Sequence, residues 1–181
     1  MSEFRAAYRY ALALIGVAEE MNKLDDVSND LTSLEKLIED SKEFTLFLKS
    51  PVINNEKKKR VLTEILQGKT SELTLKFVLL LAGKGREGLL PEIIRQFSKL
   101  RDERLGILRA TTRTAVAFKP EQEKLLISQI ETATKKSVRM SYVIDPALKG
   151  GFMVQHDDTV WDASVRHQLE VLRERFVEGT A

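Results

Sequence analysis

The chain changes character at residues 106–118, GILRATTRTAVAF, which contain five β-branched residues: three Thr, one Ile and one Val. β-Branched residues favour extended structure, so these residues after Gly106 predict a β-strand. Before this point, up to about Leu105, apolar residues recur at steps of three and four, which is typical of amphipathic helices. We therefore predict an α+β fold, mostly helical, with a bundle over residues 1–105 and a small α/β domain over residues 106–181.

The same periodicity divides residues 1–105 into six helices joined by short connections, and a compact bundle is the expected arrangement. The helices are expected over residues 3–20, 24–38, 41–49, 55–66, 71–82 and 90–104. After the first strand, Pro120 suits the first turn of a helix. Further strands are expected over residues 138–144, 152–155 and 159–161, followed by a final helix in which Val165, Leu169, Leu172 and Phe176 share one face.

Composition excludes several functional classes. The 181 residues carry 29 basic and 27 acidic side chains, a formal charge of +2, without the basic excess of proteins that coat nucleic acid. The chain contains no cysteine and two histidines, which argues against thiol catalysis and Cys- or His-rich metal sites. No apolar run approaches the roughly 18 residues that a membrane-spanning helix needs. We therefore expect no catalytic site, no metal and no cofactor.

Two motifs suggest a phosphate ligand. Residues 83–88, GKGREG, have the glycine spacing of a dinucleotide fingerprint, but they follow a predicted helix instead of the strand that such a site requires. We interpret them as a helix C-terminus and turn. Residues 57–60, KKKR, would serve a helical nucleic-acid-binding regulator, which is the alternative function, but four consecutive charges on a helix are expected mostly to face water.

An acidic group near the C-terminus could suggest a metal site, because His156, Asp157, Asp158 and Asp162 lie close together in sequence. We instead expect Asp157 and Asp158 to form a tight turn between two strands. Asp162 or Ser164 is expected to cap the last helix by accepting hydrogen bonds from its first backbone N–H groups.

Two helices carry more apolar surface than the packing of a peripheral helix needs. Residues 3–20 have one apolar stripe through Ala7, Ala11 and Leu14 and a second through Tyr10, Ala13 and Val17. Residues 73–81 are similarly rich in Leu, Val and Phe. A helix with two stripes either lies in the centre of the bundle or presents the second stripe to another protein. Periodicity alone leaves both interpretations open.

Several segments together carry a resemblance to a known family. Residues 9–14, RYALAL, residues 47–53, FLKSPVI, and the Gly85-Arg86 turn are similar to segments of the delta subunit of F-type ATP synthases, called the oligomycin sensitivity-conferring protein in mitochondria. Residues 143–152, VIDPALKGGF, with residues 162–165, DASV, resemble the most specific motif of that family in order and spacing. The resemblance extends over nearly the whole chain.

The resemblance implies a non-catalytic stator subunit that links the catalytic head to the peripheral stalk, so that rotor torque drives ATP synthesis. The first and fifth helices of the bundle would hold the N-terminal helix of an alpha subunit. The docking residues implied are Tyr10, Ala13, Leu14, Val17, Phe77 and Leu80.

The α/β domain would bind the b-type subunits of the stalk. The residues implied for this module are Gly150, Gly151, Phe152, Asp162, Ser164, Val165 and Leu169. The expected location is the cytoplasmic face of a bacterial energy-transducing membrane, with the protein held there peripherally and no transmembrane segment of its own.

Overall fold

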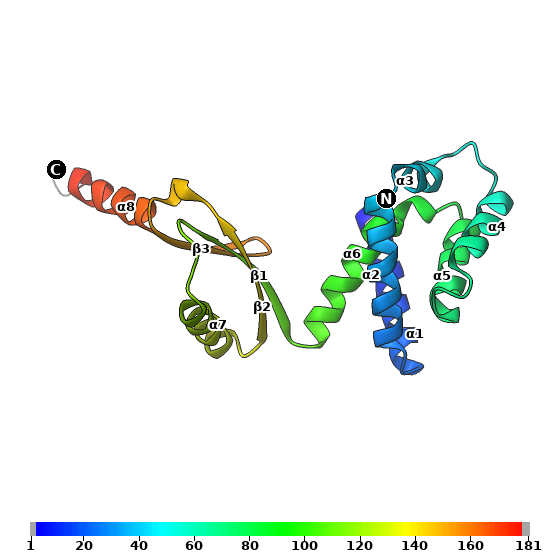
Figure 1. Cartoon of the computed structure of the whole chain (residues 1–181), viewed down its shortest axis with the longest axis horizontal. Helices are drawn as coiled ribbons and strands as arrows, with labels where there is room; N and C mark the ends of the chain where they lie inside the picture. Colours follow the sequence, from blue (N-terminus) through cyan, green and yellow to red (C-terminus); the bar gives the residue numbers. More distant parts are fainter. Residues whose placement is uncertain (1–2, 179–181) are drawn as a thin grey trace. The chain divides into compact units, whose positions relative to one another are not determined.

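The computed structural model describes residues 3–178, and the chain divides into two compact units, Met1–Arg101 and Asp102–Ala181 (Figure 1). We call them the helical unit and the α/β unit. The division falls near the end of the sixth helix, slightly before the predicted boundary at residue 105. The predicted fold class, α+β and mostly helical, is confirmed.

The helical unit contains the six predicted helices. They are α1 (Glu3–Glu20), α2 (Leu24–Asp40), α3 (Lys42–Lys49), α4 (Asn55–Leu66), α5 (Glu72–Gly83) and α6 (Leu90–Arg104), with a 3-10 turn, η1 (Glu87–Leu89), before α6. Side-chain caps begin three of them: the backbone N–H groups of Phe44, Glu56 and Thr74 donate to Ser41, Asn54 and Ser71 at 3.1, 3.1 and 3.3 Å. Each cap satisfies a backbone donor that has no partner within its helix.

The core of the helical unit lies where all six helices converge. Ile15 of α1, Leu31 of α2, Leu62 of α4 and Phe97 of α6 are at most 1% exposed and pack in one continuous apolar cluster. Each of these residues belongs to an apolar row with helical spacing, so burying the rows against one another is what closes the bundle.

The glycine-rich segment ends a helix, as the sequence predicted. α5 stops at Gly83, Gly85 has φ +63°, and the backbone N–H of Arg86 donates to the Leu81 carbonyl at 2.9 Å. A left-handed residue followed by this backward hydrogen bond is a common way to close a helix C-terminus. A helix and not a strand precedes the segment, so the context for a dinucleotide site is missing.

The KKKR segment mostly faces water, as predicted, with Lys58 as the exception. Lys58 is 3% exposed, and its Nζ contacts the Glu87 carboxylate and the Leu48 carbonyl, the latter at 3.2 Å. The other three charges lie toward the surface. Lys58 therefore joins α4 to the end of α3 and to η1, a role that periodicity did not indicate.

The α/β unit is a four-stranded sheet with a helix on one face. Its elements are β1 (Ile107–Thr114), α7 (Pro120–Thr134), β2 (Ser137–Ile144), a 3-10 turn η2 (Pro146–Leu148), β3 (Gly151–His156), β4 (Thr159–Ser164) and α8 (Val165–Glu178). The strand order is β2-β1-β3-β4, with β1 parallel to β2 and antiparallel to β3. Leu126 of α7 packs on Leu108, Ala110 and Val154, which form the small core of this unit.

Two predicted strands end at different residues. The first was expected to run to residue 118, but it stops at Thr114, because the chain must leave the sheet to form α7 before it returns as the parallel strand β2. Phe118 instead packs edge-on against Tyr142 and Phe152, at centroid distances of 6.1 and 5.8 Å. The last strand reaches Ser164 instead of residue 161, since β4 pairs with β3 along its whole length.

The turn after β3 agrees with the sequence. Asp157 and Asp158 connect β3 to β4, and Asp157 has φ +47°. Aspartate tolerates this left-handed conformation better than most residues do. Among residues 3–178 there is no group of three or more His, Asp and Glu side chains placed to hold a metal ion.

Candidate functional site

α1 and α5 form a shared surface in the helical unit through one aromatic contact. Tyr10 of α1 meets Phe77 of α5 edge-on, with ring centroids 6.4 Å apart and planes at 71°. Both rings are half-buried, so each keeps one side toward solvent. Edge-to-face packing of this kind holds two rings in a defined geometry.

Apolar side chains on both sides of this contact remain exposed. Val17, about two turns after Tyr10, is 41% exposed, and Leu80, about one turn after Phe77, is 47% exposed. Ala13 lies at the surface between Tyr10 and Val17. We call this surface, made of Tyr10, Ala13, Val17, Phe77 and Leu80, the α1/α5 groove.

Leu14 does not belong to the groove, and the prediction was wrong for this residue. Its side chain is 3% exposed and packs in the bundle core with Ala11 and Ala18. These three residues follow the i, i+3, i+7 spacing of one helix face, and that face points inward. The second stripe of α1 is thus the exposed one.

Arg86 borders the groove and was not predicted as a site residue. Its guanidinium lies over the Tyr10 ring, 5.8 Å from the centroid, and Nη1 donates to the Tyr10 hydroxyl at 3.4 Å. Arg86 itself is exposed. The sequence signal was its position directly after the turn that ends α5, but the spatial proximity to Tyr10 depends on the packing of α1 against α5.

The second predicted site lies in the α/β unit, where Gly150 lies close to the start of α8 and Gly151 allows β3 to approach β4. A Cβ on Gly151 would lie 2.3 Å from the Ala163 carbonyl oxygen, and the residue has φ +73°. A Cβ on Gly150 would lie 2.9 Å from Val165 Cγ2, and the Gly150 carbonyl accepts a hydrogen bond from the Val165 N–H at 3.0 Å. The two glycines therefore have a packing role.

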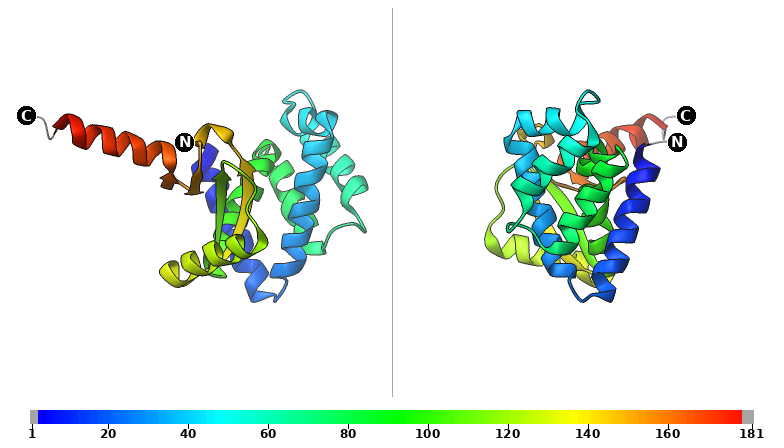
Figure 2. Two further views of the ribbon diagram at one scale, coloured as in Figure 1. Left: turned by 60° about the vertical axis from the view of Figure 1, so that its left-hand side comes forward. Right: turned by 90° about the vertical axis from the view of Figure 1, so that its right-hand side faces the viewer.

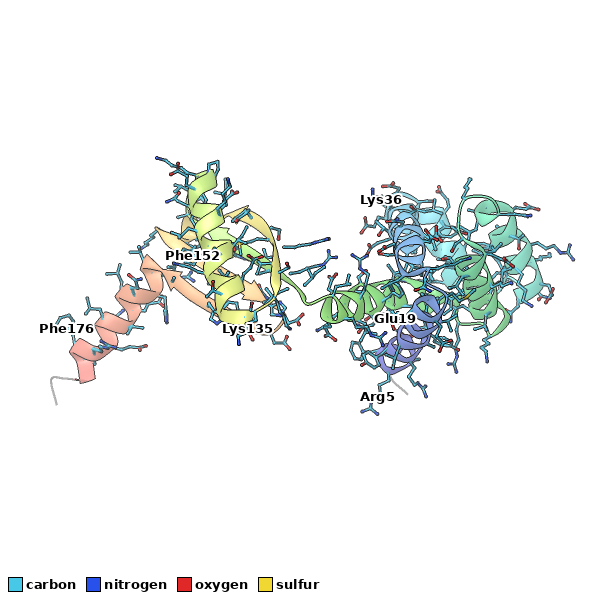
Figure 3. The ribbon with its side chains drawn as sticks, turned by 90° about the horizontal axis from the view of Figure 1, so that it is seen from below. Arg5, Glu19, Lys36, Lys135, Phe152 and Phe176 are labelled. Atoms are coloured by element: carbon cyan, nitrogen blue, oxygen red, sulfur yellow. The ribbon has the colours of Figure 1, made fainter. Side chains whose placement is uncertain are left out.

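Asp162 and Ser164 organise the first turn of α8. The Ser164 N–H donates to Asp162 Oδ1 at 2.8 Å, and the Ser164 hydroxyl accepts from the His167 N–H at 3.1 Å. Hydrogen bonds from the Ser164 hydroxyl and then from its backbone N–H hold the pKa of Asp162 below its ordinary value. Phe152 packs against the core of the α/β unit (Figure 3).

Val165 and Leu169 are the members of this set with exposed aliphatic side chains. They are 39% and 54% exposed, and the row continues through Leu172 and Phe176 at 48% and 71%. The steps of four, three and four residues place these side chains along one side of α8. α8 extends away from the sheet (Figure 2), and Phe176 lies near its far end (Figure 3).

Comparison with known proteins gives these two surfaces a context. Residues 6–176 match the family model described as ATP synthase delta (OSCP) subunit. The chain belongs to this family.

Named relatives agree with the family match. The chain is 41% identical to the ATP synthase subunit delta of Chlorobaculum parvum and 41% identical to that of Chlorobaculum tepidum, over the full length of all three chains. It is 38% identical to the subunit delta of Chlorobium limicola, covering 99% of each chain. A chain of the Toxoplasma gondii mitochondrial ATP synthase hexamer, at 22% identity, shares the fold with a TM-score of 0.69 over 94% of this chain and 97% of the other.

As a delta subunit, this protein is a non-catalytic stator component of an ATP synthase and a peripheral part of that complex. A nucleic-acid-binding role is not favoured by these relatives. In the described part of the delta chain, no helix is long and apolar enough to cross a membrane.

Proposed function

We propose that this delta subunit joins the catalytic head to the peripheral stalk through two separate surfaces. The α1/α5 groove holds the N-terminal helix of an alpha subunit, and the apolar row of α8 binds the ends of the b-type subunits. The complex carries the protein on the cytoplasmic face of a bacterial energy-transducing membrane. The exposed apolar surface beside the Tyr10–Phe77 contact is the observation that carries the proposal.

The groove has the properties that an amphipathic helix needs in a receptor. Two helices present exposed aliphatic side chains on either side of half-buried aromatic rings, and a third helix packed there would cover them. Ala13 has the smallest side chain of the groove, which allows close approach of another backbone. Tyr10 and Phe77 also pack against the core of the bundle, whereas Ala13, Val17 and Leu80 do not belong to the core cluster, so their exposed surface is not required for folding.

α8 has a different kind of surface, a single narrow row of apolar side chains. Val165, Leu169, Leu172 and Phe176 alternate at steps of four and three, the spacing of a seam between two paired helices. A helical segment at the end of a stalk subunit fits this row. The motif around Gly151, Asp162 and Ser164 then positions α8 on the sheet and takes no direct part in binding.

The mechanical role determines how tightly the protein must bind the catalytic head. Rotation of the rotor exerts torque on the head, and the head turns with the rotor unless it is held. A nanomolar joint corresponds to about 12 kcal/mol. Apolar anchors in a groove supply such affinity better than scattered surface ion pairs, which contribute about 0–1 kcal/mol each.

The test is a calorimetric titration of the protein into cognate catalytic heads and into heads whose alpha-subunit N-termini have been removed by proteolysis. We expect tight binding that is lost with the N-termini. Ala13→Glu should weaken binding at least tenfold, because it places a charge in the groove, whereas Ala133→Glu on the exposed side of α7 should bind like the parent. Undiminished binding to clipped heads would refute the assignment of the groove.

The stalk joint is tested separately, with the soluble C-terminal segment of the b-type subunits. Leu169→Glu should abolish or strongly weaken the complex, while His167→Glu, on the other side of α8, serves as the control. Equal affinity of the two variants would exclude the apolar row of α8 as the stalk site.

A further inference from the structure

The two ends of the α1/α5 groove differ, because α1 and α5 run in opposite directions. Tyr10 and Phe77 touch at mid-groove. Glu3 and Ala6, at the start of α1, line a hollow of about 650 Å³ together with residues 85–89, which follow the end of α5. The start of α1 therefore lies beside the end of α5, and the macrodipoles of the two helices oppose each other.

Charged side chains distinguish the two ends. At the end where α1 begins, the exposed basic residues are Arg86 and Lys84, the residue that caps the C-terminus of α5. The acidic residues there are Glu3 and the buried Glu87, and Glu87 is paired with Lys58. At the other end, α1 finishes with exposed Glu19 and Glu20. Near this end, Glu72 of α5 pairs with Lys76 at 2.6 Å, and Lys23 is a second basic residue close to Glu72. Because the helix dipoles of the groove cancel, these side chains determine which end of a bound helix each end of the groove attracts.

Arg86 is held in place for such a contact before any partner arrives. The Tyr10 ring supports its guanidinium at 5.8 Å, and a single N–H is directed to the Tyr10 hydroxyl at 3.4 Å. A guanidinium has five N–H donors in a planar fork, so the other donors of Arg86 are available to a carboxylate. Tyr10 itself belongs to the groove, and a ligand at Arg86 is therefore adjacent to a helix lying on Tyr10.

We infer that the helix bound in the groove runs antiparallel to α1, with its C-terminal end at Arg86 and an acidic side chain of its last turn bound to that guanidinium. This inference rests on the proposed docking of an alpha-subunit helix in the groove. The negative C-terminal end of the helix meets Lys84 and Arg86, and its positive N-terminal end meets Glu19 and Glu20. Arg86 thus sets the direction of the partner, and the apolar residues supply most of the affinity.

Disulfide cross-linking can determine the direction of the bound helix relative to α1. The chain contains no cysteine, so each introduced cysteine is the only thiol of the protein. The probe is a synthetic peptide of the cognate alpha-subunit N-terminal segment with one cysteine at either end. We expect the peptide with a C-terminal cysteine to cross-link to Lys84→Cys, and the peptide with an N-terminal cysteine to cross-link to Glu20→Cys. The opposite pairing, or equal yields in all four combinations, would overturn the inference.

A double-mutant cycle tests the Arg86 contact itself. Arg86→Gln should weaken peptide binding about two- to fivefold, the usual effect of an exposed charge pair, and reduce its salt dependence. Arg86→Lys should retain most of the affinity, and Lys36→Gln, at an exposed position of α2, is the matched control. In a peptide whose last-turn carboxylates are replaced by amides, Arg86→Gln should have no further effect. Additive effects would mean that Arg86 supports Tyr10 only and would refute the contact.

The outcomes separate this inference from the proposed function. A peptide that binds with the reverse direction leaves the groove as the docking site and overturns only the assigned polarity. A peptide that shows no binding to the unmodified protein overturns the docking proposal, and the inferred direction with it.

Discussion

Lys58 and Glu87 form an ion pair in which both side chains are 4% exposed, deep in the helical unit. The Lys58 Nζ also donates to the Leu48 carbonyl at 3.2 Å, whereas Glu87 Oε2 has no partner among the described residues. The pair joins α4 to η1, and both residues line the hollow next to Arg86. Removal of one charge would leave the other buried without compensation.

The first prediction concerns this pair. Lys58→Met should lower the free energy of unfolding of the helical unit by about 3–5 kcal/mol, because it leaves a buried carboxylate unpaired. The double variant Lys58→Met with Glu87→Gln should recover at least half of that loss. Urea denaturation followed by circular dichroism measures both. A single variant as stable as the parent would show that the pair contributes nothing.

Truncation of Leu14 and of Leu80 should have different effects, because Leu14 belongs to the core and Leu80 to the groove. Leu14→Ala should cost about 2–5 kcal/mol of stability, since the side chain is 3% exposed and its removal leaves a cavity. Leu80→Ala, at 47% exposure, should change stability by about 0.5 kcal/mol or less. Leu80→Ala should weaken binding to catalytic heads more than Leu14→Ala does, when affinity is measured on the folded fraction of each variant. Equal stability losses would contradict the boundary drawn between groove and core.

The third prediction compares two glycines of the α/β unit that both have positive φ. Gly106, with φ +63°, has open space around the position of a Cβ, whereas a Cβ on Gly151 would lie 2.3 Å from the Ala163 carbonyl oxygen. Gly106→Ala should cost about 1 kcal/mol from backbone strain alone. Gly151→Ala should cost clearly more, because β3 and β4 must also separate. Thermal unfolding of the two variants measures the difference, and equal melting temperatures would argue against the close approach.

The fourth prediction concerns pH and Asp162. Its pKa is lowered from an ordinary value of 3.8 by hydrogen bonds from Ser164, so the folded state favours the ionised carboxylate. The resulting stabilisation is present above the unfolded pKa and is lost as the pH falls through the lower folded value. Asp162→Ala should therefore be less stable than the parent at pH 7, and the difference should shrink below about pH 4. A difference that stays constant down to pH 2 would exclude stabilisation by the ionised Asp162 carboxylate.

Much of this protein could be derived from its sequence by local rules. The helices of the bundle follow from apolar periodicity, and the strands of the α/β unit follow from alternation and β-branched residues. The turns at Gly85 and Asp157 were correctly predicted because a left-handed conformation favours Gly, Asn and Asp wherever it occurs. These features depend on residues within one or two turns of each other, which is the range over which a sequence pattern carries information.

Tertiary structure decided which of several equivalent side chains became core and which became surface. Periodicity gives α1 two apolar stripes, and only packing against the other helices assigned Leu14 to the interior and Val17 to the groove. The burial of Lys58 against Glu87, 29 positions later, and the placement of Arg86 over Tyr10, 76 positions away, depend in the same way on contacts between distant segments. Such contacts arise from the mutual fit of complete helices, so no local pattern in the chain encodes them.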